Sequence, residues 1–222
     1  MPLPRGQPNS RRTGRPSRQR RRLSAEAHVP FVGLTGGIGA GKSTALAALE
    51  RLGAAVLSTD AVVGELYRSA DLRDALVDRW GEAMAPDGVV DRTAVADRAF
   101  ASVEERRWLE GLVWPRVADR IAQWREQLER RRPPPPAAVV EVPLLFEAGM
   151  ESIFEATVAV IADEQLRARR AAARGHARVA ERAAAQLSQD EKASRATYVV
   201  RNDADEVQLE LALGDVIRSL RA

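Results

Sequence analysis

The sequence of 222 residues contains no cysteine and only two histidines, His28 and His176. The absence of cysteine excludes a disulfide framework, a thiolate zinc site and a cysteine nucleophile. Two histidines so far apart are too few for a histidine-rich metal site. No stretch approaches the roughly 18 consecutive apolar residues of a membrane-spanning helix, and the first apolar run, at 29–35, is too short for a signal-peptide core. We therefore expect a cytoplasmic protein with no membrane partner.

Lysine is also scarce, because Lys42 and Lys192 are the only two lysines among 34 basic residues. The net charge of +3 arises from residues 1–22, which hold eight arginines and no acidic residue, whereas the remainder carries a net charge of −5. Residues 1–28 are rich in Arg, Pro, Gly and Ser, and we expect a disordered tail. It is either a nucleic-acid-binding arm or a solvated extension, including one from a start codon assigned too far upstream. The extension is favoured, since no aromatic residue or folded module accompanies the arginines.

From residue 30 onward, short apolar runs alternate with helical patterns. The runs predict strands at 30–35, 54–58, 137–142, 156–162 and 197–200. The helical patterns cover 43–52, 61–80, 92–131 with a break at Trp114 and Pro115, 163–194 and 206–220. This alternation predicts one α/β domain over 29–222, with a parallel sheet flanked by helices on both faces.

The strongest chemical signal is the string Gly36-Gly37-Ile38-Gly39-Ala40-Gly41-Lys42-Ser43, which matches the phosphate-loop pattern G-x-x-x-x-G-K-[ST] in full. Glycines let the backbone turn with positive φ and bring its N–H groups close to phosphate oxygens. The following helix directs its positive end at the same anion. Lys42 would supply charge to the β- and γ-phosphates of ATP, and the Ser43 hydroxyl would ligate Mg²⁺. The residues expected to bind the nucleotide are Gly37, Ile38, Gly39, Ala40, Gly41, Lys42, Ser43 and Thr44.

The loop indicates a nucleoside triphosphate but does not choose the reaction. A GTPase would need an Asn-Lys-x-Asp motif, which the sequence lacks. ATPase motors carry an apolar strand that ends in an acidic residue, and the nearest equivalent here ends at Glu141, in a chain that is short for a motor. A small-molecule kinase fits best.

Further charged residues lie near the predicted carboxyl ends of strands or on the helical segment at 163–194. Asp60 follows the strand at 54–58, at the edge where α/β sheets bind ligands. The local sequence leaves two roles open for Asp60: proton acceptor for a substrate hydroxyl, or N-cap of the next helix. Arg170 and Arg174 lie four apart on one helical face and suit phosphate recognition. The alternative for most arginines of this segment is a solvated helix.

The sequence resembles the dephospho-CoA kinases over about residues 31–220. The resemblance rests on motifs in a fixed order. The loop opens with the Thr-Gly-Gly-Ile-Gly core at 35–39, and Asp60 stands where the family has the last residue of an Asp-Ala-Asp segment. Three further strings follow: Val-Pro-Leu-Leu-Phe-Glu at 142–147, Arg-Ala-Ala-Ala-Gln at 182–186 and Tyr-Val-Val-Arg-Asn at 198–202. Many kinases share the loop, whereas the loop followed by Val-Pro-Leu-Leu-Phe-Glu is specific.

This resemblance implies a P-loop NTPase kinase core, a helical acceptor-binding insert at about 61–132 and a helical lid at about 163–192. It implies transfer of the γ-phosphoryl of ATP to the ribose 3′-hydroxyl of dephospho-CoA, the last step of coenzyme A synthesis, with Asp60 as general base. Lys42, Arg170 and Arg174 would act on the transferred group, and Arg182 and Asn202 would bind the nucleotide. The residues implied to bind the acceptor are Thr35, Asp60, Pro143, Leu144, Phe146 and Glu147, with core packing equally open for Leu144 and Phe146. Lid closure would exclude water.

Some positions differ from the family pattern. Trp114 stands before Pro115 where the family usually has histidine, and Ser58 replaces the first aspartate of the Asp-Ala-Asp segment. Two alternatives to the dephospho-CoA reaction remain: another small-molecule or nucleoside monophosphate kinase, and a nucleotide-dependent nucleic-acid-binding protein. We expect a monomer or weak oligomer that does not bind nucleic acid outside the tail.

Overall fold

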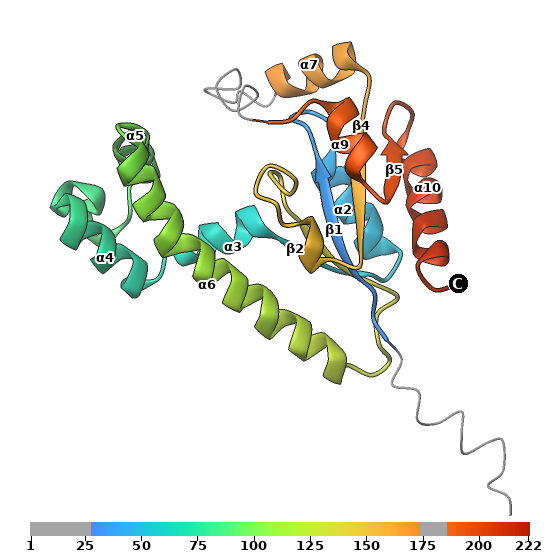
Figure 1. Cartoon of the computed structure of the whole chain (residues 1–222), viewed down its shortest axis with the longest axis horizontal. Coiled ribbons are helices and arrows are strands. Elements are labelled where there is room, and N and C mark those ends of the chain that lie inside the picture. The colour runs from blue at the N-terminus through green and yellow to red at the C-terminus, as the bar shows by residue number, and fades with distance from the viewer. Residues whose placement is uncertain (1–27, 174–185) are drawn as a thin grey trace, which may run out of the picture.

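The computed structural model describes residues 28–173 and 186–222 (Figure 1). Of the tail predicted at 1–28, only His28 lies within these ranges, and the predicted lid residues Arg174 and Arg182 lie outside them. In the described part of the chain, no helix combines the length and the apolar character that crossing a membrane requires.

Five parallel strands form the sheet of the described residues, in the order β2-β3-β1-β4-β5. Their bounds are β1 Phe31–Gly36, β2 Ala55–Ser58, β3 Ala138–Glu141, β4 Ala156–Ile161 and β5 Tyr198–Arg201. Each strand end lies within one residue of its predicted position, so the parallel α/β sheet is confirmed. The three central strands are buried along nearly their whole length, which is why they are apolar runs in the sequence.

Helices cover both faces of this sheet. On one face, α2 (Lys42–Arg51) and α10 (Glu206–Ser219) share an apolar core with Val32 and Leu34 of β1. On the other face, Phe31 of β1 belongs to a second core, which includes buried residues of the segment at 61–132. Successive side chains of a strand point to opposite faces, so β1 contributes to both cores.

The segment predicted as an insert holds four helices, α3 Thr59–Leu66, α4 Ala70–Trp80, α5 Arg92–Phe100 and α6 Val103–Arg130. Two 3₁₀ turns, η1 Glu82–Met84 and η2 Pro86–Gly88, join α4 to α5. Figure 1 shows α4 and α5 at the far end of the long α6, away from the sheet. Of these helices, α3 follows β2 directly, and α6 reaches β1 through Arg125, whose guanidinium lies 4.5 Å from the ring centre of Phe31.

The helix boundaries in this segment differ from the prediction at three places. The predicted break at Trp114 and Pro115 is wrong, because α6 runs through Pro115 without interruption. Pro115 removes one backbone donor, but buried Val113 and Val117 on either side hold the helix against the core. The actual interruptions lie at Ser69 and Ser102, whose hydroxyls cap α4 and α6.

The C-terminal third supplies α7 (Glu164–Ala173) and α9 (Gln189–Arg195), preceded by the 3₁₀ turn η3 (Glu151–Ile153). The helical pattern predicted over 163–194 is confirmed for α7 and α9, whereas Leu187 and Ser188 are not helical. Ser188 instead begins α9 through a capping box with Glu191. In Figure 1, α7 lies beyond the end of the sheet at which β1 finishes.

Candidate active site

The carboxyl ends of three neighbouring strands bring the predicted chemistry to one edge of the sheet. The phosphate loop follows β1, Asp60 follows β2, and Glu141 is the last residue of β3. Since β2, β3 and β1 are adjacent and parallel, these groups meet where open α/β sheets bind ligands.

The phosphate loop has the conformation that anion binding needs. Gly39 and Gly41 have φ values of 77° and 94°, which other residues rarely adopt. Gly41 is the N-cap residue of α2 and offers no side chain to the N–H groups of the first turn. The Lys42 Nζ donates to the carbonyl oxygens of Gly36 at 2.9 Å and Gly37 at 3.4 Å, so its ammonium lies over the loop. The helix end and this ammonium together favour a phosphate group.

Asn202 holds the loop from the side of β5. Its side chain is 5% exposed, and Nδ2 donates to the carbonyl oxygen of Ala40 at 2.9 Å. A Cβ on Gly41 would clash with this nitrogen, so the close approach requires glycine. The Arg170 Nη1 donates to the carbonyl oxygen of Asn202 at 3.1 Å. Beside these residues is a cavity of about 420 Å³, lined by Gly41, Thr44, Arg170, Asn202, Ala204, Asp205 and Glu206.

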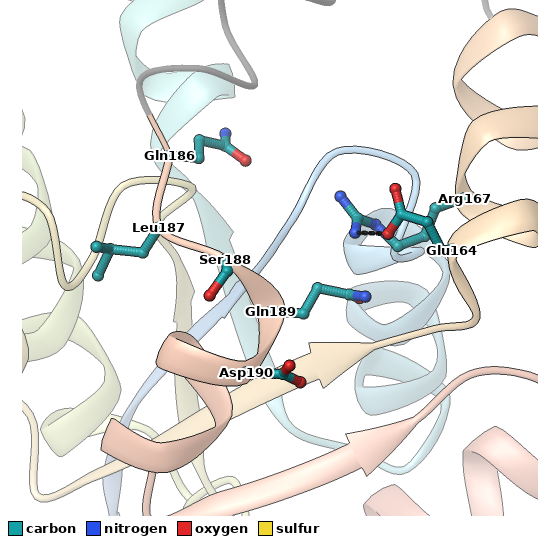
Figure 2. A pocket seen from close by; sticks show the side chains of 7 residues that line it. All are labelled: Glu164, Arg167, Gln186, Leu187, Ser188, Gln189 and Asp190. Atoms are coloured by element: carbon teal, nitrogen blue, oxygen red, sulfur yellow. Dashed lines mark hydrogen bonds and ion pairs between the residues drawn. The ribbon is translucent and has the colours of Figure 1, made fainter.

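Arg167 covers the outer side of the same loop. Its Nε donates to the carbonyl oxygen of Ile38 at 3.0 Å, and its Nη2 would lie 2.9 Å from a Cβ placed on Gly37. A second bond, from Nη1 to Glu164 at 2.7 Å, fixes the guanidinium (Figure 2). A cavity of about 240 Å³ lies beside this pair, lined by Glu164, Arg167, Gln186, Leu187, Ser188, Gln189 and Asp190. Figure 2 shows these side chains.

Two carboxylates lie on the strand-end side of the loop. Glu141 is 7% exposed and accepts a hydrogen bond from the Ser58 hydroxyl at 2.7 Å. Burial raises the pKa of the Glu141 carboxyl, the bond from Ser58 and the charge of Lys42 oppose this, and the charge of Asp60 adds to it. Lys42 and Asp60 are therefore close enough to Glu141 for their charges to act on it.

Asp60 is exposed in the first turn of α3, and Ser58 rather than Asp60 is the N-cap residue. The capping role that the local sequence left open thus does not describe its position. The buried Thr59 hydroxyl donates to the carbonyl oxygen of Glu141 at 3.0 Å, which ties the start of α3 to the end of β3. Asp60 is held at the sheet edge with its carboxylate accessible.

The Val-Pro-Leu-Leu-Phe-Glu string forms a turn directly after β3. Thr35, 0% exposed, donates from Oγ1 to the carbonyl oxygen of Pro143 at 3.2 Å. Phe146 is 3% exposed within the core, and the Arg195 guanidinium lies 4.8 Å from its ring centre, so Phe146 has the environment of a packing residue. Leu144 is half-buried. Glu147 is half-buried and pairs with Lys192, Nζ to Oε1 at 2.8 Å.

The family model for dephospho-CoA kinase, CoaE, matches residues 30–208, a range that includes all of these groups. The chain belongs to the dephospho-CoA kinase family. A dephospho-CoA kinase of Anaeromyxobacter dehalogenans is 39% identical over 176 residues, which cover 77% of this chain and 82% of the relative. One from Moorella thermoacetica is 36% identical over 180 residues, covering 79% and 84%. The crystal structure of TT1252 from Thermus thermophilus has a TM-score of 0.73 at 35% identity and covers 88% of this chain and all of its own.

The predicted residues other than Leu144 and Phe146 divide into three groups. The loop, Asp60, Arg170 and Asn202 converge at the sheet edge, whereas Thr35, Pro143 and Glu147 lie together behind it, around Lys192. Arg174 and Arg182 lie outside the described residues.

Sequence reasoning did not assign Arg167, Glu141 or Lys192 to the site. Signals for them existed: Arg167 lies three residues before Arg170, Glu141 ends an apolar strand, and Lys192 is the second of two lysines.

Proposed function

We propose that this protein transfers the γ-phosphoryl of ATP to the 3′-hydroxyl of dephospho-CoA, producing coenzyme A and ADP. The single observation that carries the proposal is that the phosphate loop with Lys42 and the start of α3 with Asp60 lie at one sheet edge, in a chain of the dephospho-CoA kinase family. A loop of this kind supports phosphoryl transfer by positioning and by charge rather than by covalent chemistry.

The phosphate side of the reaction is assigned to the loop and its supports. The N–H groups of the first turn of α2 would bind phosphate oxygens, and the Lys42 ammonium would exchange its carbonyl partners for the β- and γ-phosphates. Arg170, which already reaches Asn202 beside the loop, would stabilise charge on the transferred group. We propose the same for Arg174, four residues further along.

The acceptor side is assigned to Asp60. Its exposed carboxylate would accept the proton of the attacking hydroxyl as the oxygen bonds to phosphorus. Glu141 is less suited to meet a substrate directly, because it is buried and already accepts a hydrogen bond from Ser58. The charges of Lys42 and Asp60 act on its carboxyl.

The residues present fit a magnesium ion carried by the nucleotide. Mg²⁺ prefers oxygen ligands and usually binds through one or two protein groups together with phosphates and water. Ser43, Asp60 and Glu141 offer a hydroxyl and two carboxylates at this edge, and the described residues hold no cluster of three or more acidic or histidine ligands. Ser43 would hold the ion. When bound, it would neutralise charge on the β- and γ-phosphates.

The test is an ADP-release assay with Mg·ATP on a panel of acceptors: dephospho-CoA, nucleoside monophosphates, gluconate and shikimate. Turnover is expected with dephospho-CoA alone, and Trp114 would then be a tolerated substitution. Turnover only with another acceptor would keep the kinase and refute the substrate. ATP binding without turnover on any acceptor would favour the nucleotide-dependent binding protein.

The oligomeric state and the location of the protein stay predictions from the sequence: a monomer or weak oligomer in the cytoplasm.

Arg167 provides a prediction on the nucleotide side. In Arg167→Gln the bond to the Ile38 carbonyl is lost, and a hydrogen bond from a charged donor contributes about 1.5–3 kcal/mol, so the KM for ATP should rise by roughly tenfold or more. Arg169→Gln is the matched control, because Arg169 is exposed and its bond among the described residues stays within its own helix, to the carbonyl oxygen of Gln165. Steady-state kinetics with ATP varied should separate the two variants, and equal KM values would contradict the role of Arg167.

A further inference from the structure

Lys192 is a fully buried charge that the proposed reaction does not use. It lies on α9 with an exposed fraction of 0%. Its Nζ donates to Glu147 at 2.8 Å (Oε1) and 3.1 Å (Oε2), to the Pro143 carbonyl oxygen at 2.9 Å and to the Thr35 hydroxyl at 3.4 Å. Lysine is almost never fully buried unless it is paired. All of its donors have partners here.

The contacts of Lys192 join three segments that are distant in the sequence. Thr35 belongs to β1 and directly precedes Gly36, whose carbonyl oxygen accepts from Lys42. Pro143 and Glu147 belong to the turn after β3. The segment just before α9 also reaches Glu147, since the Leu187 backbone N–H donates to Oε1 at 2.8 Å. The Thr35 hydroxyl completes the network by donating to Pro143.

The residue type carries information, because 32 of the 34 basic residues are arginine. Arginine presents its donors as a rigid planar fork that suits one carboxylate. The partners of Lys192 are three different groups, a carboxylate, a carbonyl oxygen and a hydroxyl, which a compact ammonium with three rotatable donors can satisfy together. The arrangement of these three acceptors therefore suits the shape of a lysine ammonium as well as its charge.

Stability alone is a weak reason for this arrangement. Desolvation of a buried ion pair offsets much of its attraction, and apolar replacements of both partners are often neutral or stabilising. A buried pair that ties separate segments together instead fixes their relative position. Here it fixes the 143–147 turn against the end of β1, one residue before the phosphate loop.

We propose that Lys192 is a positioning residue for phosphoryl transfer. It holds the 143–147 turn, and with it the acceptor side of the site, at a set distance from the phosphate loop, while touching no reacting atom. This inference rests on the proposed function and on the acceptor-binding role that the resemblance to dephospho-CoA kinases implies for residues of that turn. A misplacement of about 1 Å in a reacting pair lowers the rate by about 10²-fold. The loss of a single buried contact can therefore lower the rate of phosphoryl transfer measurably.

The decisive variant removes both charges. Lys192→Met alone leaves Glu147 without its ammonium partner and should lower the melting temperature. Lys192→Met combined with Glu147→Gln leaves no unpaired charge, so the melting temperature should return close to that of the wild type. In this double variant, kcat/KM for dephospho-CoA should still be reduced by about 10²-fold, with the KM for ATP changed less than about twofold. Ser194→Ala, at an exposed position of the same helix, should match the wild type in every parameter.

A purely structural role gives a different result. It predicts that the double variant regains kcat/KM together with its melting temperature, and this outcome would overturn the inference. If the double variant does not fold, Lys192→Arg replaces it: reduced kcat/KM in a folded Lys192→Arg variant supports positioning, and wild-type kcat/KM overturns it. Absence of wild-type turnover with dephospho-CoA would refute the proposed function instead, and the same variants would then be compared with the acceptor identified in the panel.

Discussion

Lys42→Ala is expected to lower kcat by about 10³-fold, the largest effect of any single substitution in this protein. The ammonium of Lys42 lies over the phosphate loop, bound to the carbonyl oxygens of Gly36 and Gly37. No other residue of the loop carries a positive charge, so alanine leaves the loop itself with backbone N–H donors only. The measurement is steady-state turnover with saturating Mg·ATP and dephospho-CoA.

Lys42→Arg and Arg51→Ala are the two controls. Lys42→Arg keeps the charge, but a planar guanidinium does not reproduce a compact ammonium, so turnover should remain well below that of the wild type. Arg51 lies at the other end of α2 and pairs with Glu210 on the surface; its alanine variant should keep wild-type kcat. A Lys42→Ala protein with full activity would refute the assignment of the phosphate loop.

The sheet and the loop are predictable because local sequence determines them. Buried parallel strands must be apolar on both faces, and the turn into α2 needs glycine at positive φ. Each of these features can therefore be recognised from a short stretch of sequence. The helical insert was harder to predict. Pro115 is a local signal for a break, and the tertiary packing of Val113 and Val117 overrides it.

Two helix starts in the insert have local signals in the sequence. Ser102 followed three residues later by Glu105 has the spacing of a capping box, and the structure begins α6 there. Ser69 begins α4 with its hydroxyl accepting from the N–H of Leu72. Short polar side chains that satisfy backbone donors were the better guide to boundaries than proline.

The missed site residues act through contacts that are distant in the sequence. Lys192 bonds to residues 45, 49 and 157 positions away, and Arg167 reaches Ile38 at a separation of 129. Local periodicity shows that these side chains lie on helices but not what those helices cover. The Val-Pro-Leu-Leu-Phe-Glu string illustrates the same limit: its specificity indicated the family, whereas only the fold separates buried Phe146 from the polar contacts of Pro143 and Glu147.

Asp60→Asn is expected to lower kcat by about 10²-fold or more, with the KM for ATP nearly unchanged. Asparagine has almost the same shape but cannot accept the proton of the acceptor hydroxyl. The cost in folding should be small, because Asp60 is exposed and is not the N-cap residue. A carboxylate in the first turn of a helix contributes about 0.3–1 kcal/mol through the helix dipole.

Asp71→Asn is the matched control for Asp60→Asn. Asp71 occupies the same position in α4 that Asp60 occupies in α3, the second residue of the helix after a serine N-cap, and it is also exposed. Both variants should lose a similar, small part of the free energy of unfolding, measured by thermal or denaturant melts, whereas only Asp60→Asn should lose turnover. Equal kcat in the two variants would contradict the role of Asp60 as general base and leave it only a role at the helix terminus. The buried Glu141, which shares the electrostatic field of Lys42, would then be the next carboxylate to replace, because no other acidic side chain ends one of the three strands at this edge.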